Sequence, residues 1–532
     1  MASPPGAVST AANRALARQA DSLASLARVA ARHNENLEAM HLFQEAIRRA
    51  PDRRAEWLPE LADQTLWCWL PSDAVELYRE ALALDSRPQE AQRHTRLGLA
   101  MALSWDQQLE ASLREYEALV QEQPTDLQAQ LGRARVLSWL DRNTDAKAAY
   151  EQILAADPEN FEARRELARV QSWRGKQRDA ERRLLEVHAL QPRDEATVHS
   201  LAQTQEWLGR PDRAAATLRS HLQDVPDDAR ASAMLQSLER SQRTDWRLDQ
   251  VESRQSDDLA IGVTRFAADV QAHQGLTTVG PRWEYQRYRH DDTDESVHVQ
   301  RPGVYVRHRF SDAVEFNGVG SVDRIDVRHI DEQHTRTTYD AWVTMWPNDP
   351  LRIDVGSSRT TLDNIQSLSR NIVAAFFNVA ADFRPDERAL FVGRMNWGDY
   401  TDGNARLWGQ LEAERRLANS PRFLGGGRLM AFRFREVLDH GYFNPRDYVS
   451  VEATGRLLEA HRDDRRWAIE GSAGYEHASP GGDKFIWAAG VRFDGQISQR
   501  FDVGVHLAHS SSATASSGGF ARTTFGARLG FR

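Results

Sequence analysis

The sequence predicts a two-domain α + β protein, in which an N-terminal α-helical solenoid is followed by an antiparallel β-barrel of about 16 strands. Three observations lead to this prediction. The first half repeats with a period of 34 residues, and the second half alternates apolar and polar residues in runs of about ten. No stretch of about 18–20 consecutive apolar residues occurs anywhere in the 532 residues, so helical membrane spans are excluded.

Composition and charge narrow the class further. Charged residues make up 27% of the chain and the net charge is -9, which excludes wholesale disorder and disfavours a general nucleic-acid binder. Cys68 is the only cysteine, so an intramolecular disulfide and a two-cysteine metal site are both impossible.

A helical repeat is expected over residues 20–240, after a flexible N-terminus at 1–19. The tryptophans that mark it are Trp67, Trp105, Trp139, Trp173 and Trp207, and the last three intervals between them are each 34 residues. This is the period of the tetratricopeptide repeat (TPR), a pair of antiparallel helices. Companion positions repeat with it: a small residue such as Ala74 or Ala146, an aromatic four residues later such as Tyr78 or Tyr150, and a closing proline.

Each element of the repeat has a physical reason. Small residues allow the helices to cross closely, the aromatic fills the gap behind them, and proline stops the second helix. Segments such as "LSWD" and "QEWLGR" are expected to end the first helix of each pair. For the tryptophans, core packing is the favoured interpretation, and a ladder that lines a sugar-binding groove is the alternative.

Residues 245–532 are expected to form the barrel, because apolar residues recur at every second position. The run 485–493 is typical, with Phe485, Trp487 and Val491 on one face and polar or small residues on the other. Connections alternate between short (310–313, 347–350, 384–387) and long (360–370, 439–445, 510–519), which is typical of outer-membrane barrels. A soluble β-sandwich is the alternative; it is disfavoured because one face carries bare Phe, Trp and Val.

The barrel places the chain in a bacterial outer membrane. An even number of strands leaves both ends of the barrel in the periplasm, so the helical repeat is expected there. Met1 to Thr10 have neither a basic nor an apolar segment, so no signal peptide is visible and a mature chain is expected. Phe531, next to the C-terminus, resembles the terminal aromatic signal for barrel assembly.

Catalysis has no support in the sequence, and neither cofactor nor metal is expected. No HExxH, GxSxG or Walker A pattern occurs, and the histidines show no ligand spacing. Glu412 and Glu414 could be a glycosidase pair but are interpreted as pore-lining charge, with Arg406 nearby.

Helical repeats ahead of an outer-membrane barrel resemble the bacterial exopolysaccharide export porins. These include the poly-β-1,6-N-acetylglucosamine exporter, the outer-membrane subunit of cellulose synthase and the YaiO-type barrels. The "SW" repeats carry the resemblance, together with "GYFNPRDYVS" at 441–450, of which Gly441, Tyr442, Phe443, Asn444, Pro445 and Tyr448 form the family-like motif. The chain is shorter than the large members of that family, with fewer repeats, and has Asn444 where Ser is commoner.

The resemblance implies that the barrel conducts a nascent biofilm polysaccharide and that the TPR domain docks periplasmic synthesis or modification proteins. Alternation then predicts the residues that line this path: Tyr305, Arg307, Arg309, Trp342, Arg352, Asp382, Arg394, Trp408, Glu412, Arg433, Arg435, Tyr448, Glu452 and Arg492. Both charge signs occur among them, which favours a neutral or partly cationic polymer over a strongly anionic one. A non-conducting outer-membrane scaffold that displays the TPR domain is the alternative function.

Overall fold

The fold is taken from a computed structural model that describes residues 5–85, 92–419, 421–460, 465–498 and 500–531. Packing divides the chain into two compact units, Met1–Gln171 and Ser172–Arg532. The first unit is helical. The second unit contains both the last helices and the barrel, so these two parts can be described together.

The helices of the first unit form antiparallel pairs. They are α1 (Pro5–Arg32), α2 (Asn36–Arg49), α3 (Arg54–Trp67), α4 (Pro71–Leu84), α5 (Arg93–Trp105), α6 (Leu109–Glu122), α7 (Leu127–Trp139) and α8 (Asn143–Ala156), and α9 (Phe161–Trp173) runs across the boundary. As predicted, α3, α5, α7 and α9 each end at a tryptophan of the 34-residue series.

Close packing between a tyrosine and a glycine of the next helix holds neighbouring pairs together. A methyl group placed on Gly98 of α5 would lie 2.5 Å from the ring of Tyr78 of α4, and one on Gly132 of α7 would lie 2.2 Å from the ring of Tyr116 of α6. Both rings are buried. In these two repeats the aromatic ring therefore requires a residue without a side chain opposite it.

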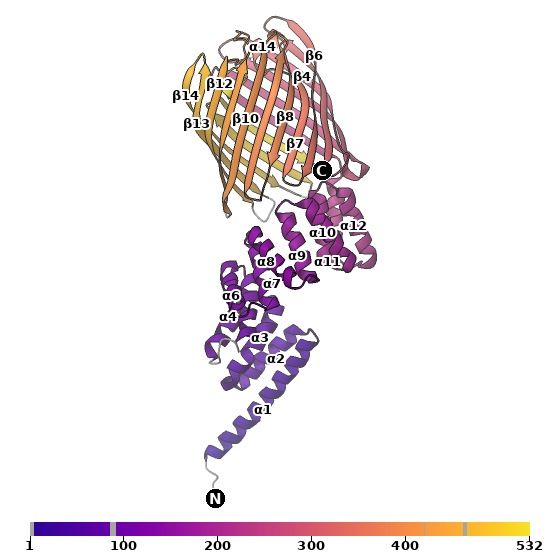
Figure 1. Ribbon diagram of the computed structural model, residues 1–532, viewed down its shortest axis with the longest axis vertical. Coiled ribbons are helices and arrows are strands. Elements are labelled where there is room, and N and C mark those ends of the chain that lie inside the picture. The colour runs from indigo at the N-terminus through magenta and orange to yellow at the C-terminus, as the bar shows by residue number, and fades with distance from the viewer. Residues whose placement is uncertain (1–4, 86–91, 420, 461–464, 499, 532) are drawn as a thin grey trace. The chain divides into compact units, whose positions relative to one another are not determined.

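The second unit begins with helices α10 (Gln177–Leu190), α11 (Glu195–Trp207), α12 (Pro211–Asp224) and α13 (Ala229–Ser241) (Figure 1). Sixteen antiparallel strands follow and pair in sequence order: β1 (Asp245–Gln255), β2 (Leu259–Ala272), β3 (Thr277–His290), β4 (Ser296–Arg309), β5 (Val314–Val327), β6 (Glu332–Asn348), β7 (Leu351–Thr361), β8 (Val373–Phe383), β9 (Ala389–Tyr400), β10 (Ala405–Asn419), β11 (Arg422–Phe434), β12 (Asp447–Ala460), β13 (Arg466–Ser479), β14 (Gly482–Gln496), β15 (Phe501–Ser510) and β16 (Arg522–Phe531).

Pairing of β1 with β16 closes the sheet into a barrel, with Trp246 opposite Phe531 and Gln255 opposite Arg522. The predicted fold class is confirmed, strand number included. The strands have 10 to 17 residues, enough to cross a bilayer, which takes about 9–11 residues of tilted strand.

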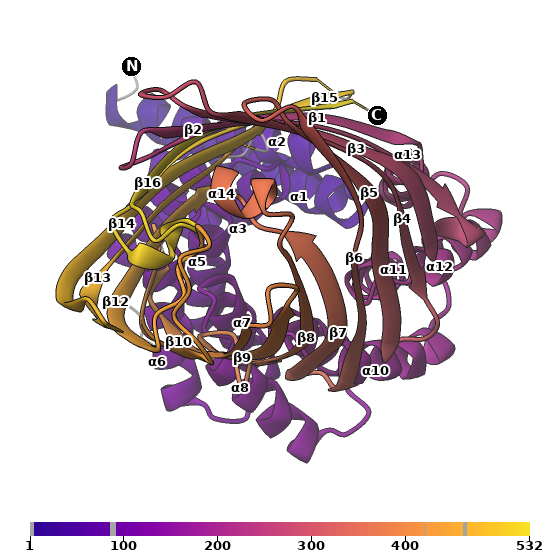
Figure 2. The same cartoon turned by 90° about the horizontal axis from the view of Figure 1, so that it is seen from above.

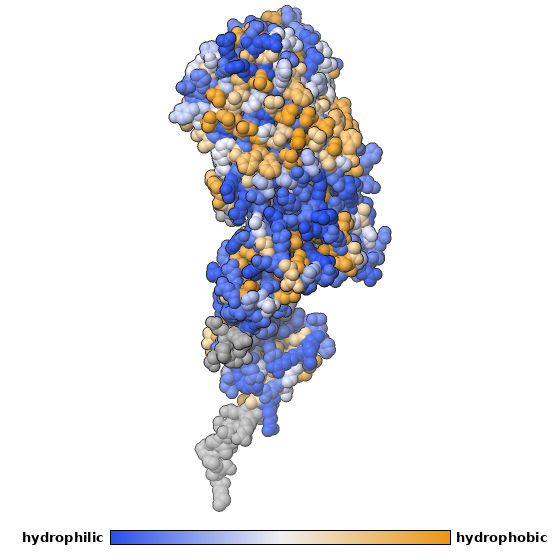
Figure 3. All heavy atoms as spheres, viewed as in Figure 1, coloured by the Kyte–Doolittle hydropathy of each residue, from blue (hydrophilic) through white to orange (hydrophobic). Residues whose placement is uncertain are grey.

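Aromatic and aliphatic side chains gather on the outside of the barrel. Phe377, Trp397 and Leu407 are directly paired across three strands, and each is more than half exposed. Figure 3 shows such residues as an orange band over the strands, with hydrophilic residues above and below. This band has the character of a lipid-facing surface. Among the described residues, none of the helices combines the length and apolarity needed to cross a bilayer.

The two ends of the barrel differ. We call the end that carries α10–α13 the helix end and the opposite one the distal end. The helix-end connections are short, for instance 310–313 and 349–350, whereas the distal end has the long connections 362–372, 435–446 and 511–521. The connection 362–372 contains a short helix, α14 (Ile365–Ser369), which lies inside the ring of strands (Figure 2).

Phe531 is suited to a test of the membrane assignment, because it faces outward, paired with Trp246 and in contact with Phe501 at 5.0 Å between ring centroids. We expect Phe531→Asp to reduce the amount of assembled barrel, since a charge on the lipid face costs about 2–4 kcal/mol at the bilayer midplane and less near the interface. Heat-modifiable migration in gels measures assembly. Thr524→Asp, on the inner face of the same strand, should assemble normally; equal losses in both variants would contradict the lipid-facing assignment.

Candidate functional site

The interior of the barrel is the candidate functional site, and strand pairing defines which residues face it. Cross-strand partners share a face of the sheet, and successive residues alternate between faces. With the apolar band outside, the inner face holds twelve of the predicted path residues: Tyr305, Arg307, Arg309, Trp342, Arg352, Asp382, Arg394, Trp408, Glu412, Tyr448, Glu452 and Arg492. Their role in conducting a polymer remains a prediction.

Arg433 and Arg435 do not face the interior. Arg433 lies opposite Leu407 in the outer row, binds Asp447 at 2.7 Å, and its side chain is 73% exposed. Arg435 follows the last residue of β11 and is also exposed. The expectation was wrong because it assumed that apolar residues face lipid, whereas Phe432 and Phe434 of this strand are buried on the inner face.

Tyr448 faces inward but is covered. It is only 3% exposed, its ring stacks on Phe432 at 4.4 Å between centroids, and its hydroxyl donates to Glu476 at 2.8 Å. Tyr448 therefore does not line an open path, contrary to the expectation from the sequence, although it lies on the inner face. The ring is part of a packed aromatic cluster.

Charges on the inner wall are mostly neutralised by one another. Arg301 binds Asp323 at 2.7 Å and Glu284 at 2.9 Å, and Arg492 binds Asp494 at 2.6 Å. Beside this wall, near β1–β5, lies a cavity of about 620 Å³ lined by Arg247, Asp269, Arg282, Glu284, Arg301 and Tyr305. The wall is therefore polar without a large excess of either sign in this region.

The distal end is narrowed by α14, which is anchored on an apolar patch of the inner wall. Ile365 and Leu368 of α14 are buried against inward-facing residues of β2–β5, among them Ile261, Val299 and Ile325. Sequence reasoning missed this anchor, although Asn364, which accepts a hydrogen bond from the Ser367 N–H, is a recognisable N-cap.

Connection 435–446, which carries the family-like motif, folds onto α14. Gly441 has φ +84°, and a methyl group there would lie 2.5 Å from Gln366, so only glycine fits this approach. Tyr442 donates to Asp402 at 2.9 Å, and Asn444 is buried and exchanges hydrogen bonds with the backbone of Leu438. The motif is thus a structural junction of the distal connections.

Asp402 is the charged centre of this junction. Burial raises the pKa of the Asp402 carboxyl, but hydrogen bonds from His440 and the Asn404 N–H outweigh this, and the pKa lies below its ordinary value. The carboxylate therefore stays ionised and holds connections 401–404 and 435–446 together.

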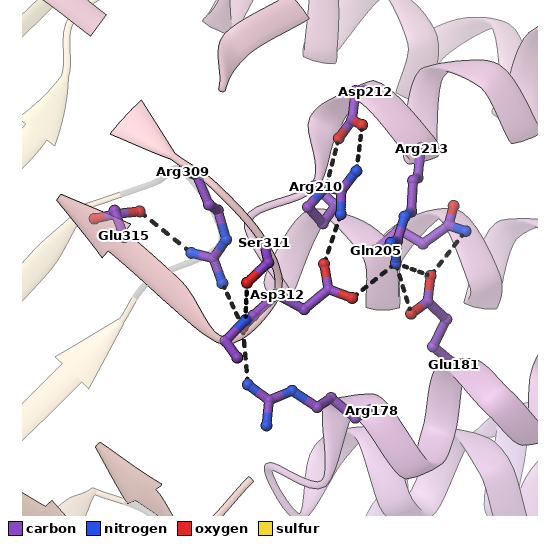
Figure 4. Close-up of polar contacts among 11 residues, drawn as sticks. Arg178, Glu181, Gln205, Arg210, Asp212, Arg213, Arg309, Ser311, Asp312 and Glu315 are labelled. Carbon is purple, nitrogen blue, oxygen red and sulfur yellow. Dashed lines mark hydrogen bonds and ion pairs between the residues drawn. The ribbon is translucent and has the colours of Figure 1, made fainter. Parts of the chain in front are cut away.

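At the helix end, acidic residues of the barrel turns bind the helices: Asp349 accepts from the Arg178 N–H, Glu387 pairs with Arg174, and Asp312 makes the largest set of contacts. Asp312 lies at the tip of the turn between β4 and β5 (Figure 4), where its carboxylate accepts from Arg210 at 2.7 Å and from Arg213 at 2.9 Å. Its backbone carbonyl accepts from Arg178 at 2.8 Å. Three helix arginines thus converge on one turn, a contact that nothing in the local sequence around Asp312 indicates.

The pKa of Asp312 reflects these contacts. Burial raises the pKa of the carboxyl, but the hydrogen bond from Arg210 and the charge of Arg213 lower it more, so the pKa lies below its ordinary 3.8. The carboxylate remains charged at neutral pH and its two arginine partners remain paired.

Most of the repeat tryptophans lie on the surface. Trp67 and Trp207 are each 50% exposed, and Trp139 and Trp173 are also exposed, so core packing is wrong for these four. The reason is their position as the last residue of a helix, beside the loop. The cores of the repeats are filled instead by residues such as Tyr78, Tyr150 and Leu218.

Comparison with known proteins finds one family match, within the helical repeats. The tetratricopeptide repeat family matches residues 140–203. Among curated proteins, none matches the chain in sequence. A solved bacterial polysaccharide outer membrane secretin is 14% identical, with a TM-score of 0.44, over 55% of this chain and 98% of its own.

Two solved helical proteins are similar as well. PilW, a type IV pilus biogenesis factor, is 18% identical over 41% of this chain and 97% of its own, with a TM-score of 0.35. A tetratricopeptide repeat protein from Parabacteroides merdae ATCC 43184 is 19% identical over 38% of this chain and 78% of its own, with a TM-score of 0.34. At such identities and scores, none of the three indicates a function. The fold itself defines the class: an outer-membrane barrel protein with TPR-type helical repeats.

We expect Asp312→Asn to loosen α10–α12 from the barrel, because Arg210 and Arg213 lose their carboxylate partner on the barrel and keep only those on the helices, Asp212 and Glu181. The free energy that holds these helices on the barrel should fall by about 1–2 kcal/mol, a value that allows for solvent screening of the charge on Arg213. Hydrogen–deuterium exchange of α10–α12 measures it. Asp386→Asn is the matched control, since that carboxylate accepts hydrogen bonds from the backbone of its own turn. Unchanged exchange in the Asp312 variant would refute the role of this contact.

The same contact should depend on pH. A carboxyl whose pKa is lowered by folding stabilises the contact above its unfolded pKa and loses that contribution as pH falls through the folded value. The protection of α10–α12, expressed as exchange relative to the intrinsic rate at each pH, should therefore be constant in the wild type at pH values well above 3.8 and fall below it. The Asp312→Asn variant should lack this acid-induced loss of protection.

Proposed function

We propose that the chain is an outer-membrane porin that exports a secreted polysaccharide of the biofilm type. The helical repeats lie in the periplasm and dock the proteins that synthesise or modify the polymer. The chain itself conducts the polymer and catalyses no reaction. One observation carries this proposal: an inner wall of mutually paired charges, with inward-facing aromatic residues, inside a barrel joined to helical repeats.

The wall chemistry suits an uncharged, hydroxyl-rich chain. Arginines and carboxylates that are already paired, as in Arg301–Asp323, present hydrogen-bonding groups without a net field that would hold a polyanion or repel it. Rings such as that of Trp342, which faces inward and is half-buried, offer flat apolar surface to the C–H faces of sugars. A neutral polysaccharide can exchange hydrogen bonds with this wall as it moves, and no strong electrostatic attraction holds it at one point.

The helix end supports the direction of transport. Both the first and the last strand have an end there, and α10–α12 are fixed to its turns through Asp312. In an outer-membrane barrel with short periplasmic turns, this end faces the periplasm. The repeats then stand where a polymer made at the inner membrane arrives.

A second function, a non-conducting scaffold that displays the repeats, is favoured by one observation. The distal end is occupied by α14 and by connections 435–446 and 511–521, which are tied together: Asn364 donates to Ser517 at 2.9 Å and Ser367 to the His440 carbonyl at 2.8 Å. A plug of this kind could hold the barrel closed permanently. Conductance separates the two functions.

The full-length protein in a planar bilayer should conduct ions, and neutral oligosaccharides should block the current. Oligomers of β-linked glucose or N-acetylglucosamine should block at lower concentration than polyanionic oligogalacturonate of the same length. Block by the polyanion alone would reverse the polymer class while leaving export in place. Absence of any conductance would favour the scaffold, provided that a variant in which the anchor of α14 is removed shows no conductance either.

Removing the anchor of α14 should open the distal end. In the double variant Ile365→Ser, Leu368→Ser, the helix loses two buried apolar side chains, each worth about 2–5 kcal/mol if truncated in a packed core. We expect single-channel conductance to rise severalfold. Ser369→Ala, which keeps both anchors, should conduct as the wild type does. If the double variant and the wild type are both non-conducting, export through this barrel is refuted.

A further inference from the structure

A second cavity lies between the inner wall and the distal connections. Its volume is about 460 Å³, and its lining includes Arg406 and Trp408 of β10, Phe434 of β11 and Tyr442 of connection 435–446. Residues 514–517 of connection 511–521 line it too and add hydroxyl groups. The volume is within the range of small-ligand sites, which are mostly apolar with a few directed polar groups.

Arg406 is the unusual member of this lining. Its guanidinium lies over the rings of Phe376 and Phe434, at 5.0 and 5.9 Å, and donates one hydrogen bond, to Asn396 at 3.1 Å. Its Nε is buried and has no hydrogen-bond partner. Within the described part of the chain, no carboxylate lies within ion-pair distance of it.

The lack of a carboxylate distinguishes Arg406 from the other arginine of the cavity. Arg522 is bound to Asp363, and the inner-wall arginines Arg301, Arg456 and Arg492 each bind at least one carboxylate. The cavity therefore has one uncompensated positive charge. A half-buried guanidinium without a counter-charge is costly, so the arrangement favours an anion supplied by a ligand.

Trp408 lines the cavity beside this charge, half-buried and packed on its other side against the cluster of Phe432 and Tyr448. It is the next inward position of β10 and lies opposite Asn396 and Phe432. Tyr400 stacks on Tyr442, and Phe432 on Tyr448, so those rings already cover one another. Across the described residues, no ring stacks on Trp408, which leaves its half-buried indole available to a ligand.

We propose that this cavity binds a pyranose residue that carries a carboxylate, as a uronic acid or an acid-substituted sugar does. The carboxylate pairs with the Arg406 guanidinium, whose planar fork matches two oxygens, and the sugar ring lies on Trp408. The hydroxyl groups of connection 511–521 are placed to exchange hydrogen bonds with those of the sugar. The cavity is thus a recognition site at the exit of the barrel.

This inference rests on the proposed export function and refines its substrate. Because the charges of the wall elsewhere are largely paired, the polymer as a whole is nearly neutral. The uncompensated Arg406 of this cavity then selects acidic residues that occur at intervals along the polymer. The recognition site holds such a residue beside α14 and the connections that narrow the exit.

Calorimetric titration of the full-length protein in detergent tests this, with three probes: a neutral β-linked glucose trisaccharide, the same trisaccharide with one glucuronate residue, and acetate alone. The acidic trisaccharide should bind at least tenfold more tightly than the neutral one, and acetate at equal concentration should give no measurable binding. Equal affinity for both trisaccharides would overturn the proposal, and binding of acetate as tight as that of the acidic sugar would reduce the site to an anion site and overturn it too.

Variants assign the effect to residues. Arg406→Gln should abolish the preference for the acidic sugar, and Trp408→Ala should weaken binding of the acidic trisaccharide at least tenfold. Arg415→Gln, on the outer face of the same strand, should bind as the wild type does. A preference that survives Arg406→Gln in a correctly assembled barrel would refute the site. Should that variant fail to assemble, the comparison of the three probes on the wild type still decides.

The conductance of the same preparations separates the two proposals. If neutral oligosaccharides block the current but the acidic sugar shows no preferential binding, the recognition site is wrong and export stands. If neither the wild type nor the variant without the α14 anchor conducts, export itself is wrong.

Discussion

Closure of the sheet is the constraint on which the rest of the barrel depends. A sheet in lipid cannot leave an edge with unpaired backbone groups, so β1 must pair with β16. Once the barrel is closed, every strand side chain points either to the outside or to the inside. The pairing of its residue with the neighbouring strands determines which. The outer row Phe377–Trp397–Leu407 and the inner positions of Trp408 and Arg406 are consequences of one register.

The inner wall of the barrel is not polar everywhere. It becomes apolar where the distal connections fold into the barrel. Apolar inward residues form two patches: one on β2–β5 that holds Ile365 and Leu368 of α14, and one of stacked aromatics around Phe432 and Tyr448. Each patch covers part of the wall that would otherwise be wet. The connections that fold inward are held by apolar side chains of these patches. A fully charged, hydrated wall would offer them no apolar contact in exchange for the water they lose.

Much of the fold could be predicted from the sequence, because the two periods, 34 and 2, are local and repeat many times. The helix ends at Trp67, Trp105 and Trp139 and the strand number follow from these periods alone. The face of a strand is harder to predict, because alternation defines two rows without saying which one is outside. For β11 the inner row is the apolar one, with Phe432 and Phe434, so Arg433 was assigned to the wrong side.

Contacts between distant segments could not be predicted at all. Asp312 meets Arg210 and Arg213 across about a hundred residues of chain, and nothing periodic links them. The same holds for α14 and connection 435–446, whose meeting point needs glycine at Gly441. The family-like motif could be recognised in the sequence. Its role as a junction could not, because that role depends on α14, which lies about seventy residues earlier in the chain.

The two ends of the barrel use charge in opposite ways, and this difference bears on how a polymer could pass. At the helix end Asp312 is saturated by arginines, so the contact is rigid and offers nothing to a ligand. At the distal end Arg406 is held by rings and one amide and keeps its charge uncompensated. With a fixed entrance beside the repeats and a receptive Arg406 at the exit, the wall between them, whose charges are mostly paired, would not hold the polymer tightly. Selection would then take place once, at the point where α14 and the distal connections narrow the path.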